Sequence, residues 1–295
     1  MDVLGIPIQA LLGQLLLGLI NGAFYALLAL GLAIIFGLLN VANFVHGAQY
    51  MLGAVISWML LQFAGIGFWP SLIITPLIGF ALGAALERSM LSRLYETDPI
   101  YGILLTFGVA LVVQGVLRAQ FGVSGMTYGI PDALSGGWNL GFMFLPKYRA
   151  WVVLVALLVC CSTWYAIEKT SLGASVRAAT ENSAMAEALG INVARLKTMI
   201  YGLGAAIAAL AGVLAAPIYS VSPLMGADIV IIAFAIVVIG GMGTLLGSTV
   251  AGFGLGLVEG ASKVFYPQIS GMVVFIVMVV ILLVRPSGLF GRASA

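Results

Sequence analysis

The chain is dominated by long apolar runs that short polar segments separate. The stretch from Val273 to Val284 is wholly apolar, without alternation of polar and apolar positions. A strand of a membrane β-barrel alternates over about ten residues, whereas a membrane-spanning helix needs about 20 mostly apolar residues in succession. A helix also satisfies its own backbone hydrogen bonds in lipid. The pattern therefore predicts an all-α fold, a polytopic transmembrane helical bundle.

We expect about eight to nine membrane segments, some of them short or broken. They lie at residues 8–38, 46–64, 70–88, 100–118, 151–167, 198–218, 228–241, 248–262 and 270–284. The first is long, and is either one tilted helix or a full helix followed by a half-helix. The pair 228–241 and 248–262 is short for full crossings, and forms either two short spans or a re-entrant pair. No linker divides the runs, so residues 1–295 are expected to form one membrane domain.

Composition supports a membrane protein and argues against other classes. Hydrophobic residues make up 62% of the 295 positions and charged residues 7%, with a mean hydropathy of +1.18; soluble domains carry about 25% charged residues. The net charge of +2 forms no basic patch, so nucleic acid is not an expected partner. Cys160 and Cys161 are adjacent within an apolar run, which favours packing over a disulfide or a metal site. The single histidine, His46, excludes a multi-histidine metal centre, and we expect no bound cofactor.

Basic residues predict the orientation. They concentrate in residues 87–98, in residues 169–197 and in the C-terminal tail, whereas the first forty-five residues contain no Lys or Arg. Cytoplasmic segments carry the excess of Lys and Arg. We therefore expect residues 171–198 and the C-terminus in the cytoplasm and the N-terminus on the periplasmic side. The loop from Arg118 to Arg149, assigned outside, is the main exception.

The segment from Ser171 to Thr198 is the one long, charged, helix-favouring stretch between spans. Asn182 or Ser183 can cap the start of a short helix. Residues 184–189 favour helix, and Gly190 suits the left-handed position that ends it.

Two apolar side chains of this short helix share a face. Met185 and Leu189 are four residues apart, and they form a small apolar knob in a charged setting. Asn192 can cap the next helix. Such a knob can dock in the groove of a soluble partner. The alternatives are a solvated loop or a helix folded back on the bundle.

The segment resembles the cytoplasmic coupling loop of ABC importer permeases. The residues Glu187 to Asn192 are similar to the Glu-Ala-Ala…Gly pattern of that loop, in a variant form. Other stretches continue the similarity along most of the chain: Asn21 to Leu27, Asn43 to Gly47, Ala211 to Leu214, Gly240 to Gly247 and Arg285 to Gly291. In this order and spacing they resemble the permease subunits of the high-affinity branched-chain amino acid ABC transporter family, of the LivH type.

Two features depart from that family's pattern. Ala48 and Gln49 follow His46-Gly47 where many relatives have an acidic residue, and the loop from Phe121 to Pro146 matches no pattern. Both leave the substrate open, because relatives also move urea or short amides.

The resemblance implies a permease subunit of an ATP-binding cassette importer in the bacterial inner membrane. Such a subunit forms the translocation path for branched-chain or related hydrophobic amino acids, which a periplasmic binding protein delivers. It works with a second, homologous permease of the LivM type and with two subunits that bind ATP and Mg. The candidates for contact with these ATPases are Arg177, Glu181, Met185, Glu187, Ala188, Leu189, Gly190, Ile191 and Asn192.

Polar residues within or beside the spans are the candidates for the translocation path. They are Asn21, Tyr25, Asn43, His46, Gln49, Gln114 and Glu259. Polar groups in a membrane usually face the bundle interior or a water-filled path. The alternative is helix–helix hydrogen bonding, worth about 0.6 kcal/mol on average. For Glu259 we expect first an i,i+4 pair with Lys263 and second a role in the path.

Two other function classes are weaker. An ion-coupled secondary transporter uses intramembrane charges, which are scarce here. The sequence Gly122-Val123-Ser124-Gly125 resembles the serine motif of rhomboid proteases, but a turn-rich stretch follows it and the only histidine precedes it. We expect no catalytic residues. The chain has no Gly-x-x-x-x-Gly-Lys-[Ser/Thr] phosphate loop, so ATP hydrolysis is expected in partner subunits.

Overall fold

The computed structural model describes residues 2–3 and 6–291, which form a bundle of helices with two small hairpins. The α-helices are α1 (Ile8–Leu39), α2 (Val45–Ala64), α3 (Phe68–Ser89), α4 (Pro99–Phe121), α5 (Lys147–Lys169), α6 (Ser171–Glu181), α7 (Ser183–Ala188), α8 (Val193–Ala215), α9 (Met225–Gly240), α10 (Leu245–Phe265) and α11 (Val273–Val284). Short 3-10 turns lie at η1 (Leu91–Leu94), η2 (Asp132–Leu134) and η3 (Pro267–Ile269). The antiparallel hairpins pair β1 (Asp2–Val3) with β2 (Ile6–Pro7) and β3 (Gly137–Asn139) with β4 (Phe144–Pro146). The expected cytoplasmic C-terminus, residues 292–295, lies outside the described part.

Every segment predicted to enter the membrane is helical, so the all-α bundle is confirmed. Within the described residues, six helices are long and apolar enough to cross a membrane: α1, α3 with η1, α4, α5, α8 and α10. The helices α9 and α11 are shorter and apolar. Of the two possibilities for the first run, the single helix is correct: α1 has 32 residues, about 48 Å at 1.5 Å per residue.

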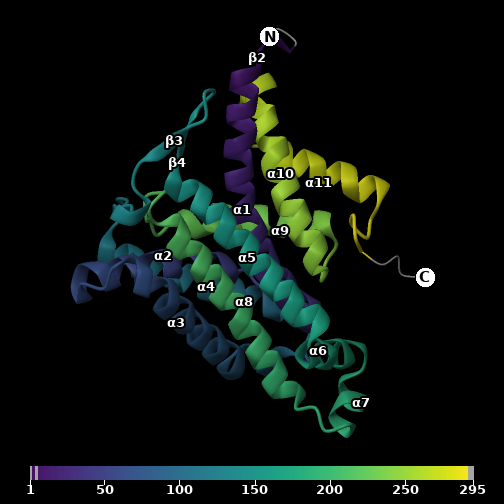
Figure 1. The fold of residues 1–295 in the computed structure, drawn as a ribbon. Helices are drawn as coiled ribbons and strands as arrows, with labels where there is room; N and C mark the ends of the chain where they lie inside the picture. Colours follow the sequence, from purple (N-terminus) through teal and green to yellow (C-terminus); the bar gives the residue numbers. More distant parts are fainter. Residues whose placement is uncertain (1, 4–5, 292–295) are drawn as a thin grey trace.

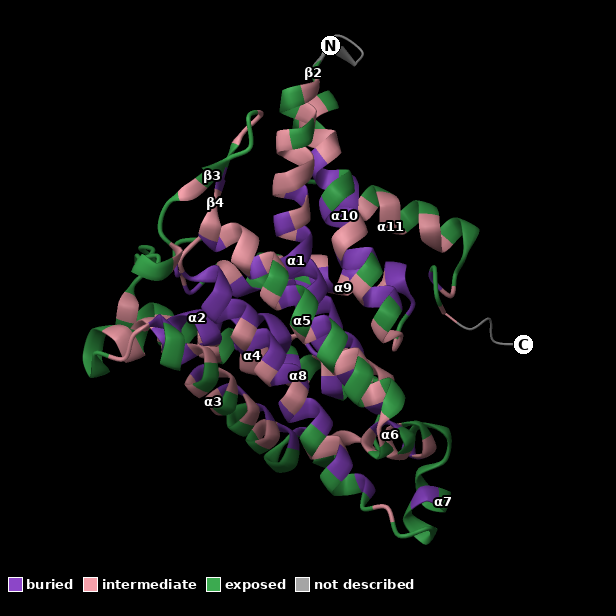
Figure 2. Ribbon diagram, in the orientation of Figure 1, coloured by how far each residue is buried: buried purple, intermediate pink, exposed green. Residues whose placement is uncertain are grey.

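The helix α1 is the axis of the bundle. Every residue from 22 to 35 is buried, as expected for a helix that is apolar on all sides. It packs most extensively against α10 and also contacts α8, α5 and α9. Figure 1 shows α1 and α10 side by side along the upper half of the molecule. Figure 2 shows burial concentrated on the central helices and exposed residues along the outer faces of α3 and α5.

Small residues allow α1 and α10 to approach closely. A Cβ atom on Gly18 would overlap the Gly256 carbonyl oxygen, and one on Gly252 would lie 2.6 Å from the Ala26 Cα. Without a hydrophobic driving force between helices in lipid, close backbone contact is a main source of their association. The glycine-rich pattern of residues 247–260 is therefore a packing surface for α1.

The segment between the fifth and sixth predicted spans contains one helix whose bounds the sequence did not predict. The helix α6 occupies residues 171–181, and α7 follows it after Asn182. Both lie at the end of the bundle opposite the N-terminus (Figure 1).

Candidate functional site

An unwound segment joins α1 to α2, and it enters the protein interior at Asn43. Residues 40–44 are not helical, and Asn40 adopts a left-handed conformation with φ of 50°. The Phe44 amide donates to the Thr106 hydroxyl on α4 at 3.3 Å, and that hydroxyl lies 3.3 Å from the Ala42 carbonyl oxygen. Irregular backbone at membrane depth requires such protein partners, because lipid offers none.

Three of the predicted path residues lie together where α2 begins. Asn43 and His46 have no exposed surface and Gln49 has 5%. The Tyr201 hydroxyl on α8 donates to Asn43 Oδ1 at 3.1 Å. His46 Nε2 lies 3.0 Å from the Leu28 carbonyl oxygen, so Nε2 carries the proton and Nδ1 is the free acceptor. Within this chain these side chains belong to the bundle interior.

The buried groups at the start of α2 are not all satisfied. Among the described residues, Asn43 Nδ2, His46 Nδ1 and Gln49 Oε1 have no hydrogen-bond partner. A buried polar atom without a partner is uncommon and costs free energy. The start of α2 is therefore polar, but it is not an ordinary closed hydrogen-bonded core.

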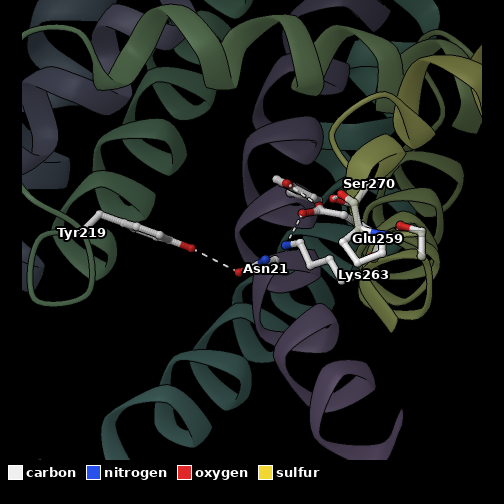
Figure 3. Close-up of polar contacts among 8 residues, drawn as sticks. Asn21, Tyr219, Glu259, Lys263 and Ser270 are labelled. Atoms are coloured by element: carbon white, nitrogen blue, oxygen red, sulfur yellow. Dashed lines mark hydrogen bonds and ion pairs between the residues drawn. The ribbon is translucent and has the colours of Figure 1, made fainter. Parts of the chain in front are cut away.

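A second polar group lies nearer the N-terminal end of α1 (Figure 3). The Tyr25 hydroxyl donates to Glu259 Oε2 at 2.7 Å, and Lys263 Nζ lies 2.6 Å from Glu259 Oε1. The predicted i,i+4 pair is thus confirmed, with Tyr25 as a further partner. The Tyr219 hydroxyl, from the α8–α9 loop, donates to Asn21 Oδ1 at 3.1 Å.

The seventh path candidate, Gln114 on α4, lies apart from both groups. It borders an apolar pocket of about 180 Å³ between α2, α4 and α9, together with Phe44, Met51, Phe107 and Val230. The Phe44 ring packs against Phe107 and Phe234, with centroid distances of 6.0 and 4.7 Å. The structure therefore divides the seven candidates among three places.

The helix α7 has well-defined ends. Asn182 is its cap, since Asn182 Oδ1 accepts from the Met185 amide at 2.9 Å. Gly190 has φ of 88°, and its amide donates to the Glu187 carbonyl at 2.9 Å. The Ile191 amide donates to the Ala186 carbonyl at 3.0 Å, which completes a Schellman stop. Asn192 caps α8 through the Arg195 amide at 2.9 Å, as predicted.

The side chains of α7 form an exposed knob. Met185 is 59% exposed and Leu189 74%, while Ala186, on the other side, is buried. Glu187, Ala188, Gly190 and Asn192 are also exposed, and Ile191 is half-buried. The remaining two candidates, Arg177 and Glu181, lie on α6 and border a separate cavity of about 830 Å³ beside the ends of α1 and α5. The Arg177 guanidinium donates to the Ile167 carbonyl at 3.0 Å, so it ties α6 to α5.

A buried carboxylate next to this end of the bundle was missed from the sequence. Glu87 on α3 is 1% exposed and accepts from the Tyr95 hydroxyl and the Thr198 hydroxyl, both at 2.6 Å. Burial and the bond to Glu87 raise the pKa of Tyr95 above its ordinary value, so the phenol remains a donor. These bonds join α3 to the start of α8, directly after α7. Residues 87 and 198 are far apart in the sequence, so no local pattern predicts the contact.

Three further residues were not predicted as part of any site. Tyr201 and Tyr219 bind predicted residues across long sequence separations. Asp228 is an exposed carboxylate in the first turn of α9. It could have been identified from the sequence, because it is a lone acidic residue in an apolar run. No group of three or more potential metal ligands occurs among the described residues.

Comparison with known proteins agrees with this architecture. Residues 14–282 match the family described as the branched-chain amino acid transport system / permease component. The chain is 28% identical to the high-affinity branched-chain amino acid transport system permease protein LivH of Escherichia coli, over 95% of this chain and 96% of that protein. It is 30% identical to the permease protein BraD of Pseudomonas aeruginosa, with the same coverage.

The second kind of permease in such systems is also similar. The chain is 28% identical to LivM of Escherichia coli, over 90% of this chain and 67% of that protein. No solved structure matches. Because the family model covers most of the chain and agrees with its polytopic helical fold, the protein belongs to the family of branched-chain amino acid transport permease components, the membrane subunits of ABC transporters.

Proposed function

We propose that this chain forms, with a second homologous permease, the translocation path of an ATP-driven importer for branched-chain or related hydrophobic amino acids. Two ATPase subunits would bind the α7 end, and a binding protein would deliver substrate at the opposite end. The observation that carries the proposal is α7, a capped helix that exposes Met185 and Leu189 in a member of this permease family.

The construction of α7 suits mechanical coupling. Its stop at Gly190 and its cap at Asn182 fix a six-residue helix that would fray alone. Ala186 is buried, and α7 packs mainly against α6 and also contacts α8, so movement of its exposed face would be passed to both helices. Apolar surface buried against an ATPase would supply about 25 cal/mol per Å².

The path itself is proposed at the polar residues of the membrane interior. Asn43, His46 and Gln49 are buried at the start of α2, Gln114 borders the apolar pocket, and Asn21, Tyr25 and Glu259 lie nearer the N-terminal end of α1. Discontinuous helices commonly build transporter sites near the bilayer centre. The break at residues 40–44 supports placing the path there.

The uptake assay for this proposal uses the complex purified with its ATPases and reconstituted in liposomes. We expect leucine uptake that requires internal ATP and the leucine-loaded binding protein. Uptake of urea or a short amide in place of leucine would reject the substrate assignment and keep the transporter class. Uptake driven by an ion gradient without ATP would reject both.

The orientation is proposed from the basic segments, with the α7 end in the cytoplasm. In a background with Cys160→Ala and Cys161→Ala, Ser183→Cys is expected to react with an impermeant maleimide only after permeabilisation, because it lies on α7. Ser135→Cys, exposed in the opposite loop, is the matched control and is expected to react in intact cells. The reverse labelling pattern would invert the topology.

A further inference from the structure

The first turn of α9 lies beside the middle part of α1, the longest of the helices that can span a membrane. Gly226 packs against Gly47, so closely that a Cβ on either would overlap the other's backbone. The preceding residue in α2, His46, contacts Leu28, which lies about 17 Å from the last residue of α1 at 1.5 Å per residue. At its other end, α9 reaches Gly240, which packs on Gly247 near the end of the bundle where α1 stops. The helix α9 has 16 residues, about 24 Å at 1.5 Å per residue, so it is shorter than the roughly 30 Å hydrocarbon core of a bilayer.

Asp228 is placed in this first turn with an exposed carboxylate. The described residues contain two ion pairs, Arg177 with Glu168 and Lys263 with Glu259, and Asp228 takes part in neither. A carboxylate at this depth is too costly to face lipid, so it must face water, a substrate or another chain.

The apolar pocket lies beside Asp228 on the same helix. Ala227 and Ile231 border the pocket and Asp228 does not, but Ile231 is three residues after Asp228, so the carboxylate lies next to the edge of the pocket-lining face. The volume, about 180 Å³, is large enough for one aliphatic side chain.

The rest of the lining has the composition of a selective site. Gln114 is the one polar side chain among the residues that border the pocket, beside the rings of Phe44 and Phe107. Binding sites for small molecules are mostly apolar, with a few polar groups that fix orientation. A hydrophobic amino acid presents these same two features, an aliphatic side chain and an adjacent α-ammonium group.

We propose that Asp228 and this pocket form a substrate subsite, in which the Asp228 carboxylate binds the α-ammonium group and the pocket between α2, α4 and α9 holds the aliphatic side chain. The inference rests on the proposed transport of hydrophobic amino acids. It identifies Asp228 as a residue that recognises the substrate and places the substrate beside α9. The exposed face of α9 would then line the water-filled path.

Accessibility tests the position independently of transport. In the complex without native cysteines, Asp228→Cys is expected to react with a charged methanethiosulfonate reagent, since only a hydrated thiol ionises readily. Leucine-loaded binding protein is expected to slow that reaction. The control is Leu77→Cys on α3, which is 64% exposed to the surroundings of the chain and should remain unreactive. An unreactive Asp228→Cys would overturn the proposal.

Transport by matched variants tests the chemistry. Asp228→Asn is expected to lower leucine uptake about thirtyfold or more, because a desolvated charge pair loses one partner. The isosteric change should leave assembly of the complex intact, and Asp228→Glu should restore part of the uptake. Full uptake by Asp228→Asn, or loss of the second permease from the purified complex, would overturn the proposal; the latter would identify Asp228 as an interface ion pair.

Substrate specificity tests the role of the pocket. Ala110→Leu fills the pocket from α4, and we expect it to lower leucine uptake about tenfold more than valine uptake. Equal effects on leucine and valine uptake would show that the pocket does not bind the substrate side chain. If the wild-type complex transports no amino acid, the proposed function fails, and the accessibility of Asp228→Cys still decides whether α9 lines a water-filled path.

Discussion

Leu189→Asp should uncouple ATP hydrolysis from transport or release the ATPase from the membrane. Leu189 is 74% exposed at the end of α7, where no part of the described chain covers it. Burial of a leucine against a partner contributes about 1.5–3 kcal/mol, so its loss weakens binding by about ten- to 100-fold. Burial of an unpaired carboxylate adds a further cost. The measurement is ATPase activity that substrate-loaded binding protein stimulates, in the lipid-reconstituted complex.

The matched control for this prediction is Glu187→Gln on the same helix. A rim charge pair is worth about 0–1 kcal/mol, so this change should weaken coupling at most about fivefold. A second variant, Gly190→Val, should also impair coupling, because Gly190 has φ of 88° and a β-branched residue disfavours that conformation. No atom lies within 4 Å of a Cβ added there, so any loss of coupling would come from the changed backbone conformation at the end of α7 and not from a steric clash. Normal coupling and normal ATPase retention in Leu189→Asp would remove α7 from the mechanism.

Gly53→Leu should prevent stable folding of the bundle. A Cβ on Gly53 would overlap the Ala209 carbonyl oxygen and lie 2.6 Å from the Ala209 Cα, so α2 and α8 would have to separate. Overpacking of a tight core costs about 1–3 kcal/mol or more, and here backbone on both sides prevents relaxation. We expect the monodisperse fraction in detergent to be nearly lost, as measured by size-exclusion chromatography of a fluorescent fusion.

The contrast for Gly53 is Gly115 on α4. No atom lies within 4 Å of a Cβ added at Gly115, so Gly115→Leu should leave the elution profile unchanged. Both changes add the same side chain to a membrane helix, and only the helix contact differs. Equal profiles for the two variants would show that the α2–α8 crossing tolerates separation.

The sequence was most informative where one physical effect dominates. The first apolar run predicted the C-terminal end of α1 to within one residue, because insertion in lipid depends on local hydrophobicity. Capping chemistry placed α7, because Asn182 and Gly190 act on their immediate neighbours. The helix α6 lies in the stretch predicted to favour helix, but its bounds were not predicted, because neither a long apolar run nor a side-chain cap marks its start.

Contacts between distant segments could not be predicted in this way. Asn43 meets Tyr201 across 158 positions, and Glu87 meets Thr198 across 111. Such pairs depend on how α3 and the segment between α1 and α2 lie against α8, which hydrophobic periodicity does not determine. The division of the path candidates among three places has the same origin, since polarity alone does not tell which side of a helix faces which neighbour.

The central position of α1 has a consequence for biogenesis. It leaves the ribosome well before α10, yet its glycine-lined face is covered by α10, which is synthesised roughly 200 residues later. At about 5–20 residues per second, this delay lasts about 10–40 s. During that interval the contact between α1 and α10 is missing, so the glycine-lined face of α1 must lie against lipid or the insertion machinery. Chains truncated before α10 should therefore be substrates for membrane quality-control proteases even though most of their helices are already inserted.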